Sequence, residues 1–511
     1  MAAPLDWTAI VVFAALFAFV TVMGFFAARW RKGDLTQLAE WGLGGRRFGT
    51  VVTWFLLGGD LYTAYTFIAV PTLMFGSGAM GFFAVPYTIL VYPILFAVFP
   101  RLWSVSRAKG YVTAADFVRG RFGNRPLALA IAVTGIVATM PYIALQLVGM
   151  GVVIGGLGIH GELPLVIAFV ILAAYTYSSG LRAPAMIAVV KDMLIYVTVI
   201  AALIVIPHEL GGYAKIFASV PPAKLLLSPP GAYNLGQQSG YATLALGSAL
   251  ALFLYPHAIT GLLSSTNRHV IKRNAVVLPA YSIALGLIAL LGYMAIASCV
   301  KSMPAYAAGF KTFGPNFAVP ALFLHMFPSW FVGVAFASIA IGALVPAAIM
   351  SIACGNLFTR NIYREYVRRD CLPAHESRVA KITSLVVKLG ALVFIVAIPQ
   401  TYAINLQLLG GIWIIQTLPA VLIGLYTRAL NPWALLIGWA SGIAAGTAME
   451  LSLGFKGAIY PLHIMGWTVP CYAALSALIL NLLVSIALSI VFNALARDDV
   501  REDETAAADY V

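Results

Sequence analysis

The sequence predicts an all-α protein that crosses a membrane about thirteen times. Of its 511 residues, 61% are hydrophobic and only 10% are charged, whereas water-soluble domains carry about 25% charged residues. Apolar runs of roughly 20 residues, the length needed to cross the hydrocarbon core, recur along the whole chain. We expect spans centred near residues 18, 62, 90, 138, 172, 197, 250, 287, 343, 390, 414, 442 and 481.

The basic residues fall in alternate loops between these spans. One side of the predicted membrane collects 24 of the 31 Lys and Arg residues, chiefly in the stretches 29–47, 101–125 and 360–381. Cytoplasmic loops carry such an excess. We therefore expect the N-terminus outside and the C-terminus in the cytoplasm. The net charge of +13 then reflects topology, and no nucleic-acid partner is expected.

The second predicted span, residues 49–71, is interrupted at its centre by Gly58, Gly59 and Asp60. Two glycines weaken a helix, and a carboxylate in hydrocarbon is costly without a partner or a cavity. A spanning helix that is broken at mid-depth is typical of a transporter site, because the opened backbone can hold ions and solute. The alternative is a glycine-rich packing face with Asp60 hydrogen-bonded to a neighbouring helix.

Other functional classes lack their motifs. The sequence contains no G-x-x-x-x-G-K-[ST] loop, so ATP-driven transport is not expected. It contains no H-E-x-x-H motif or nucleophile elbow, so we expect no enzyme activity and no cofactor. The segment 110–122 is predicted to be amphipathic and to lie on the membrane surface, and residues 496–511 form a polar cytoplasmic tail.

Several motifs, in this order, resemble the solute–sodium symporter family over roughly residues 8–495. Residues 41–49 read Trp-Gly-Leu-Gly-Gly-Arg-Arg-Phe-Gly, similar to the family's lead-in to its broken helix. Tyr-Pro-His follows at 255–257, Leu-Phe-Thr-Arg-Asn-Ile-Tyr at 357–363, and Leu-Gly-Gly-Ile-Trp-Ile-Ile-Gln-Thr-Leu-Pro at 409–419. The chain looks most similar to the bacterial branch that takes up small monocarboxylates.

The resemblance implies a leucine-transporter-type fold with two inverted five-helix repeats and alternating access. Residues 1–48 would hold an extra N-terminal helix and a cytoplasmic loop, 49–240 the first repeat and 241–430 the second. Residues 431–495 would hold two additional helices, followed by the tail. The protein is then expected in the plasma membrane, the inner membrane of a bacterium.

The family's sodium site is degraded in this sequence. The backbone carbonyls that hold sodium in the family map to Gly58, Leu61 and Gly342. The family's hydroxyl pair maps to Val345 and Pro346, whose side chains cannot bind a cation. A hard cation needs about six oxygen ligands, so we expect weak sodium binding at best.

A lysine is available near the vacated site. The family's T-D-x-x-Q pattern falls on Ile187, Ala188 and Lys191, and positions i and i+3 share a helix face. The Lys191 ammonium could occupy the sodium position on the same carbonyls and release its proton during transport. Alternatively, Lys191 reaches toward the cytoplasmic surface or pairs with Asp192, which is otherwise expected to point elsewhere as a structural partner.

Asp60 is the second coupling candidate. Its carboxylate would balance the charge of Lys191, help to carry the coupled proton, or only form a hydrogen bond at the helix break.

A small carboxylate would meet free N–H groups near Tyr62 and Thr63, where the broken helix resumes. Each further candidate also has a purely structural alternative: an interhelical hydrogen bond, aromatic packing, a bonded histidine or a wall residue. Polar groups that could complete the pocket are Gln146, Tyr255, His257 and Trp413.

The sequence thus predicts a proton-coupled symporter for a lactate-, pyruvate- or acetate-like acid. The alternatives are a sodium-coupled symporter for another small solute such as an amino acid, or a membrane sensor that does not transport. The expected partners are the organic acid and lipid, with H⁺ or else Na⁺ as coupling ion, and the protein is expected to be a monomer or a weak oligomer.

Overall fold

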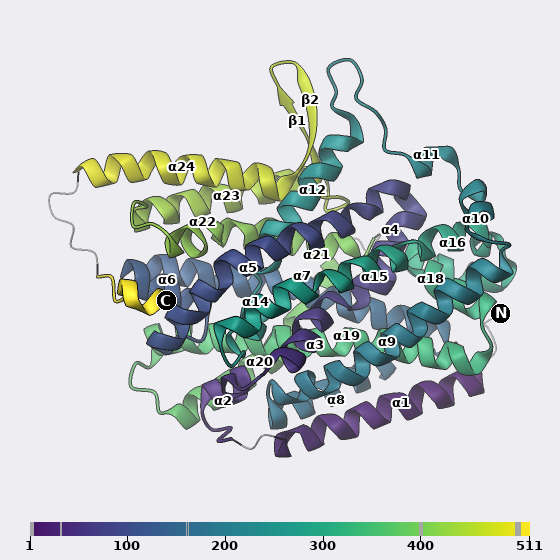
Figure 1. Cartoon of the computed structure of the whole chain (residues 1–511), viewed down its shortest axis with the longest axis horizontal. Helices are drawn as coiled ribbons and strands as arrows, with labels where there is room; N and C mark the ends of the chain where they lie inside the picture. The colour runs from purple at the N-terminus through teal and green to yellow at the C-terminus, as the bar shows by residue number, and fades with distance from the viewer. Residues whose placement is uncertain (1–4, 31–32, 160, 162, 398–401, 496–501) are drawn as a thin grey trace.

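The computed structural model describes the chain except residues 1–4, 31–32, 160, 162, 398–401 and 496–501, and except the side chains at 60, 61, 392, 393 and 395–397. It is almost entirely helical (Figure 1). The helices of the first half are α1 Trp7–Phe26, α2 Leu38–Leu43, α3 Thr50–Leu61, α4 Val70–Ser77, α5 Ala84–Lys109, α6 Ala114–Phe122, α7 Arg125–Gly156, α8 Leu163–Ser179, α9 Arg182–Glu209, α10 Tyr213–Ser219, α11 Pro222–Leu225 and α12 Gly236–Leu252. Those of the second half are α13 Pro256–Leu263, α14 Arg268–Val277, α15 Pro279–Ala289, α16 Leu291–Ala297, α17 Ala307–Phe313, α18 Ala318–Met326, α19 Ser329–Phe358, α20 Pro373–Ala397, α21 Ile404–Ile414, α22 Leu418–Val421, α23 Pro432–Ser452 and α24 Ala473–Leu495.

Short helical turns join these segments. Two are π-helical, η3 Tyr65–Ala69 and η8 Thr359–Val367. The 3₁₀ turns are η1 Ala27–Arg29, η2 Gly44–Arg46, η4 Gly78–Phe83, η5 Val300–Ser302, η6 Pro304–Tyr306, η7 Gly314–Phe317, η9 Ile415–Thr417, η10 Ile423–Leu425 and η11 Ala507–Tyr510.

Membrane-length helices account for most of the fold. Within the described residues, 9 helices are long and apolar enough to cross a membrane, or up to 10 when α12 and α13, bent by 48°, count as one. Each of the thirteen predicted centres lies in a helix, or at a helix break in the case of residue 62. The count of thirteen spans itself stays a prediction, because α8 and the apolar part of α3 are shorter than a full span.

The helix at the centre of the bundle is α19. It packs against α1, α7, α9 and α20, and nearly every residue from Phe331 to Leu357 is buried. By contrast, α1 buries only three residues. Both helices are apolar on every side, so their burial distinguishes them: α19 forms part of the inner wall, and α1 lies on the outside with its apolar side chains exposed.

Two helices break near the middle of the fold. The first is interrupted between α3 and η3, where Tyr62 has a ψ of 89° and leaves the helical conformation. The second is interrupted between α12 and α13, where Tyr255 is extended and Pro256 begins the next helix. Proline has no amide hydrogen and is favoured at the first position of a helix. Both breaks open backbone groups in the protein interior.

A β-hairpin projects from the helical body (Figure 1). Strand β1, Ile459–Ile464, pairs antiparallel with β2, Trp467–Tyr472. The turn residues Met465 and Gly466 have φ values of 48° and 82°, as two-residue hairpin turns require. This hairpin departs from the all-α chain that the apolar runs of the sequence predict.

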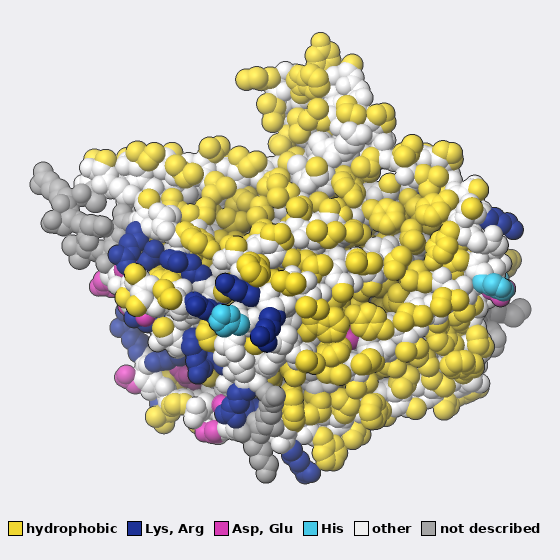
Figure 2. Space-filling model, viewed as in Figure 1, with side chains coloured by type: hydrophobic (Ala, Val, Ile, Leu, Met, Phe, Trp, Pro, Cys, Tyr) yellow, Lys and Arg dark blue, Asp and Glu magenta, His cyan; other side chains and the backbone are white. Residues whose placement is uncertain are grey.

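Lys and Arg side chains gather at the end of the molecule where the C-terminus lies, and the N-terminus lies at the opposite end (Figures 1 and 2). At the basic end, α6 is buried and begins with a capping box between Thr113 and Asp116. Asp116 also accepts a hydrogen bond from Asn361 at 2.8 Å. The prediction that 110–122 lies on the membrane surface is therefore wrong, because the polar groups of α6 bind protein partners instead of water.

Candidate functional site

The backbone that opens after α3 holds the side chain of Lys191. This lysine belongs to α9 and is fully buried. Its Nζ donates hydrogen bonds to the carbonyl oxygens of Gly59 and Tyr62, each at 2.7 Å. Carbonyls released at a helix break are typical cation ligands, and here the cation is an ammonium that the protein itself supplies.

Asp192 completes the surroundings of this ammonium. Its Oδ1 lies 2.8 Å from Lys191 Nζ, and both side chains are fully buried. Its Oδ2 accepts a hydrogen bond of 2.7 Å from the Tyr281 hydroxyl. The expectation that Asp192 points elsewhere is wrong, because the flexible lysine side chain can turn toward its neighbour on the helix. Three oxygens thus lie within 2.8 Å of Nζ.

The carbonyls that bind Lys191 lie one residue beyond Gly58 and Leu61. The Gly58 carbonyl still accepts the amide of Tyr62 at 3.0 Å, so it belongs to the last helical turn. The Thr63 amide instead donates to Thr66 Oγ1 at 3.4 Å, which leaves the Gly59 carbonyl available. The side chains of Asp60 and Leu61 lie outside the described residues.

The predicted residues of α19 are buried beside the break. A Cβ built on Gly342 would lie 4.0 Å from the Tyr62 carbonyl oxygen and 3.6 Å from Ile195 Cδ1, which places this part of α19 next to the lysine site. Val345 and Pro346 follow one helical turn later and are buried. Neither side chain has an oxygen to offer a cation.

Three tyrosines pack together beside the ion pair, a cluster that the sequence does not predict. The Tyr62 ring centroid lies 4.5 Å from that of Tyr281 and 6.0 Å from that of Tyr196. The Tyr62 hydroxyl donates to the carbonyl of Tyr281 at 3.1 Å. These residues come from three separate helical segments, so no local sequence pattern could have grouped them. Both members of the Lys191–Asp192 pair are fully buried beside these rings.

Gln146 binds the point where the broken helix resumes. Its Oε1 accepts the Ala64 amide at 3.2 Å, and its Nε2 donates to Thr63 Oγ1 at 3.4 Å. The Tyr65 amide donates to the same Thr63 oxygen at 2.9 Å. The amides near Tyr62 and Thr63, expected to meet a carboxylate, therefore already have protein partners in this structure.

We expect Gln146→Leu to lower thermal stability, because a buried amide without an acceptor costs about 1–3 kcal/mol. Thermal unfolding of the variant and of the unmodified protein in one detergent measures the difference. An unchanged melting temperature would show that this hydrogen bond contributes little.

Tyr255 and His257 form a second cluster with Tyr142. The His257 ring lies 5.4 Å from the Tyr142 ring and 5.2 Å from the Tyr255 ring, measured between centroids. The Tyr255 hydroxyl donates to the Gln407 carbonyl on α21 at 3.0 Å. The break between α12 and α13 is thus joined to α7 and α21.

Trp413 lies apart from these groups. Its Nε1 donates to Thr447 Oγ1 on α23 at 3.1 Å, and its ring contacts Phe394 on α20. These contacts attach α21 to the outer helices, as expected of a wall residue.

Cavities lie on either side of the breaks. One of about 20 Å³ lies between α7, α13, α19 and α21 and is lined by Thr113, Thr260 and Thr417 among others. It holds about one water molecule. A larger cavity of about 620 Å³ lies between α4, α12, α21 and the hairpin. Of these two cavities, the larger one lies on the hairpin side.

The comparisons with known proteins agree on one family. The sodium:solute symporter family model matches residues 41–442. The chain is 54% identical over 503 residues to the "Monocarboxylate transport permease protein" of Rhizobium johnstonii, covering 97% of this chain and 98% of that protein. It is 34% identical over 442 residues to the "Uncharacterized symporter YodF" of Bacillus subtilis, covering 86% of each.

A solved structure shows the same fold. It is the substrate-bound outward-open state of a Na⁺-coupled sialic acid symporter, with a TM-score of 0.73 and 14% identity, and the match covers 95% of this chain and 98% of that one. The expected leucine-transporter-type fold is confirmed, and the chain is a multi-pass membrane protein. This chain belongs to the sodium:solute symporter family.

Proposed function

We propose that this protein takes up a small monocarboxylate together with a proton, by alternating access. A symporter for small solutes follows from the family. The monocarboxylate is supported by the name of the Rhizobium relative, which is 54% identical over nearly its whole length. The protein would lie in a bacterial inner membrane with its C-terminus in the cytoplasm, an orientation supported by the Lys and Arg side chains at that end (Figure 2).

Proton coupling is supported by one observation: Lys191 Nζ donates hydrogen bonds to the carbonyls of Gly59 and Tyr62. A sodium ion there would need about six oxygens, and Val345 and Pro346 supply none. An ammonium has three N–H groups, and three oxygens lie within 2.8 Å of this one. The site is thus better suited to a protonated lysine than to a sodium ion.

Loss of the proton would weaken the connection between the first break and α9. A neutral amine has one N–H fewer and no charge to balance Asp192, so its attraction to the two carbonyls falls. Proton binding from outside would hold the break against α9, and proton release inside would let the two separate. Asp60 remains the second candidate for carrying the coupled proton.

The solute would bind near the resumption of the helix, beside Thr63 and Gln146. A carboxylate could replace the Gln146 oxygen at the Ala64 amide, with the dipole of the resumed helix in its favour. Tyr255 and His257 lie at the facing break and would complete the pocket. The cavity between α7, α13, α19 and α21 has a volume of only about 20 Å³. The two helix breaks must therefore move apart before a solute can leave on that side.

The test uses purified protein in liposomes with labelled lactate outside. An inward proton gradient without sodium should drive more accumulation than in protein-free liposomes, into which the neutral acid also diffuses, whereas an inward sodium gradient at equal pH should not. Accumulation with sodium alone would overturn proton coupling and favour a cation site elsewhere. If neither gradient moves lactate or acetate, the proposed substrate class is wrong.

A further inference from the structure

A separate cavity opens at the basic end of the molecule, far along α5 from the transport site. It has a volume of about 200 Å³ and lies between α5, the start of α14, the residue after η10 and the C-terminal segment. Its charged lining residues are Arg101, Arg268 and Lys272, and Tyr426 and Tyr510 form its aromatic walls. None of the described residues that line it is acidic.

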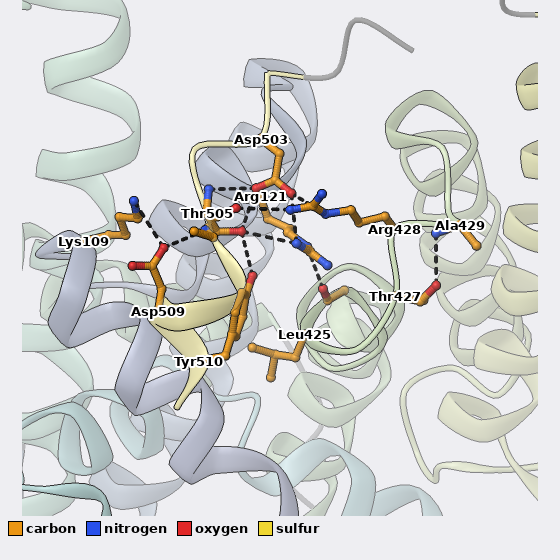
Figure 3. Close-up of polar contacts among 12 residues, drawn as sticks. Lys109, Arg121, Leu425, Thr427, Arg428, Ala429, Asp503, Thr505, Asp509 and Tyr510 are labelled. Atoms are coloured by element: carbon orange, nitrogen blue, oxygen red, sulfur yellow. Dashed lines mark hydrogen bonds and ion pairs between the residues drawn. The ribbon is translucent and has the colours of Figure 1, made fainter.

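The three cations keep their charge available for a ligand. Among the described residues, the ion pairs at this end use other basic side chains: Asp503 pairs with Arg121 and Arg428, and Asp509 with Lys109 (Figure 3). None of the ion pairs in the described part of the chain includes Arg101, Arg268 or Lys272. Three positive charges around one cavity attract an anion strongly.

Arg101 is held in place before any ligand arrives. Its Nε donates to the Leu425 carbonyl at 2.8 Å. Its guanidinium carbon lies 4.5 Å from the ring centroid of Tyr510 and 5.1 Å from that of Tyr426. A guanidinium that is fixed between two rings loses little entropy when it binds, and its planar donors match the oxygens of a phosphate.

The cavity adjoins a surface that faces lipid. Along α5, Phe96 is 45% exposed, and on α14 Val276 is 68% exposed. Figure 2 shows Lys and Arg side chains beside a broad hydrophobic surface at this end. Lys272 Nζ lies 5.3 Å from the Phe96 ring centroid, so cation and apolar surface meet directly. Basic pockets next to lipid-facing helices suit anionic head groups.

We propose that this cavity binds the phosphate head group of an anionic phospholipid whose acyl chains lie along α5 and α14. The positive charge of the lining selects a negatively charged ligand, and the adjoining apolar surface favours a lipid over a free anion. The head group would join α5, α14 and the C-terminal segment.

The C-terminal segment takes part through Tyr510, which is buried. This segment binds the body through the Asp503 and Asp509 pairs (Figure 3) and through the Glu504 amide, which donates to the Gly120 carbonyl at 2.8 Å. Tyr510 is thereby held over Arg101 and forms one wall of the cavity.

The test is retention of lipid by the purified full-length chain, measured by native mass spectrometry after incubation with phosphatidylglycerol or phosphatidylcholine. We expect a preference for phosphatidylglycerol that falls at least about fivefold in Arg268→Gln/Lys272→Gln. The control variant Arg273→Gln/Arg369→Gln removes the same charge from positions outside the cavity and should retain the preference. Tyr510→Ala should weaken it.

Three results would overturn the proposal. The first is equal retention of the two lipids by the unmodified chain. The second is an equal loss in the cavity variant and the control, which would mean diffuse attraction to the basic surface. The third is displacement of the lipid by inorganic phosphate at similar concentration, which would make a free anion the ligand.

Discussion

Lys191→Gln should abolish proton-driven accumulation of lactate in liposomes. The neutral amide carries no proton to release, and it cannot replace the charge that faces Asp192 at 2.8 Å. The variant should also be less stable by about 3–5 kcal/mol, because removing one partner of a buried ion pair leaves the other charge uncompensated. Uptake under a proton gradient and thermal unfolding measure the two effects separately.

A double variant separates coupling from stability. Lys191→Met/Asp192→Asn removes both charges, and replacing a whole buried pair is often neutral for stability. The amide oxygen introduced by Asp192→Asn would still accept the hydrogen bond from the Tyr281 hydroxyl. We therefore expect the double variant to unfold at a higher temperature than Lys191→Gln, because no uncompensated charge is left, while proton-driven uptake stays absent. Proton-driven accumulation by the double variant would exclude Lys191 as the coupling group.

Gly58→Ala should reduce transport at least about tenfold. A Cβ on Gly58 would lie 2.3 Å from the Tyr281 ring, so the ring must move, and with it the hydroxyl that binds Asp192. Overpacking of this kind costs about 1–3 kcal/mol. The measurement is initial uptake of lactate, together with the melting temperature.

The chain offers a matched control for this substitution. Gly49 precedes the same helix, has a φ of −78°, and an added Cβ would meet nothing within 4 Å. Gly49→Ala should therefore leave uptake and stability close to those of the unmodified protein. If both alanine variants behave alike, close packing of Gly58 on Tyr281 does not matter for transport.

The features that were predicted from sequence depend on long or local patterns. Apolar runs of span length locate the helices, and the Gly58-Gly59 dipeptide locates the first break, whereas the break between α12 and α13 was not predicted. The i+3 spacing of Lys191 from Ala188 and the lost hydroxyls at Val345 and Pro346 indicated the lysine position. Each of these can be read without knowledge of the packing.

The features that were missed depend on contacts between distant segments. A carbonyl at the break becomes free when the amide four residues later donates its hydrogen bond elsewhere. The Thr63 amide does so, because it donates to Thr66 Oγ1. The approach of Tyr281 to Asp192 and the binding of Asp503 to Arg121 have no local signature. The burial of α6 follows from its partners on η8, which are about 245 residues away in the chain.

The β1–β2 hairpin has a practical consequence for imaging. A helical bundle enclosed by detergent gives few features by which single particles can be aligned. The hairpin stands outside that envelope, and it is held by six paired residues on each strand and by a hydrogen bond of 2.7 Å from the Thr468 amide to the Tyr233 carbonyl. Its tip residue Met465 is 98% exposed, so an antibody fragment raised against this tip would serve as a rigid alignment mark in electron cryo-microscopy.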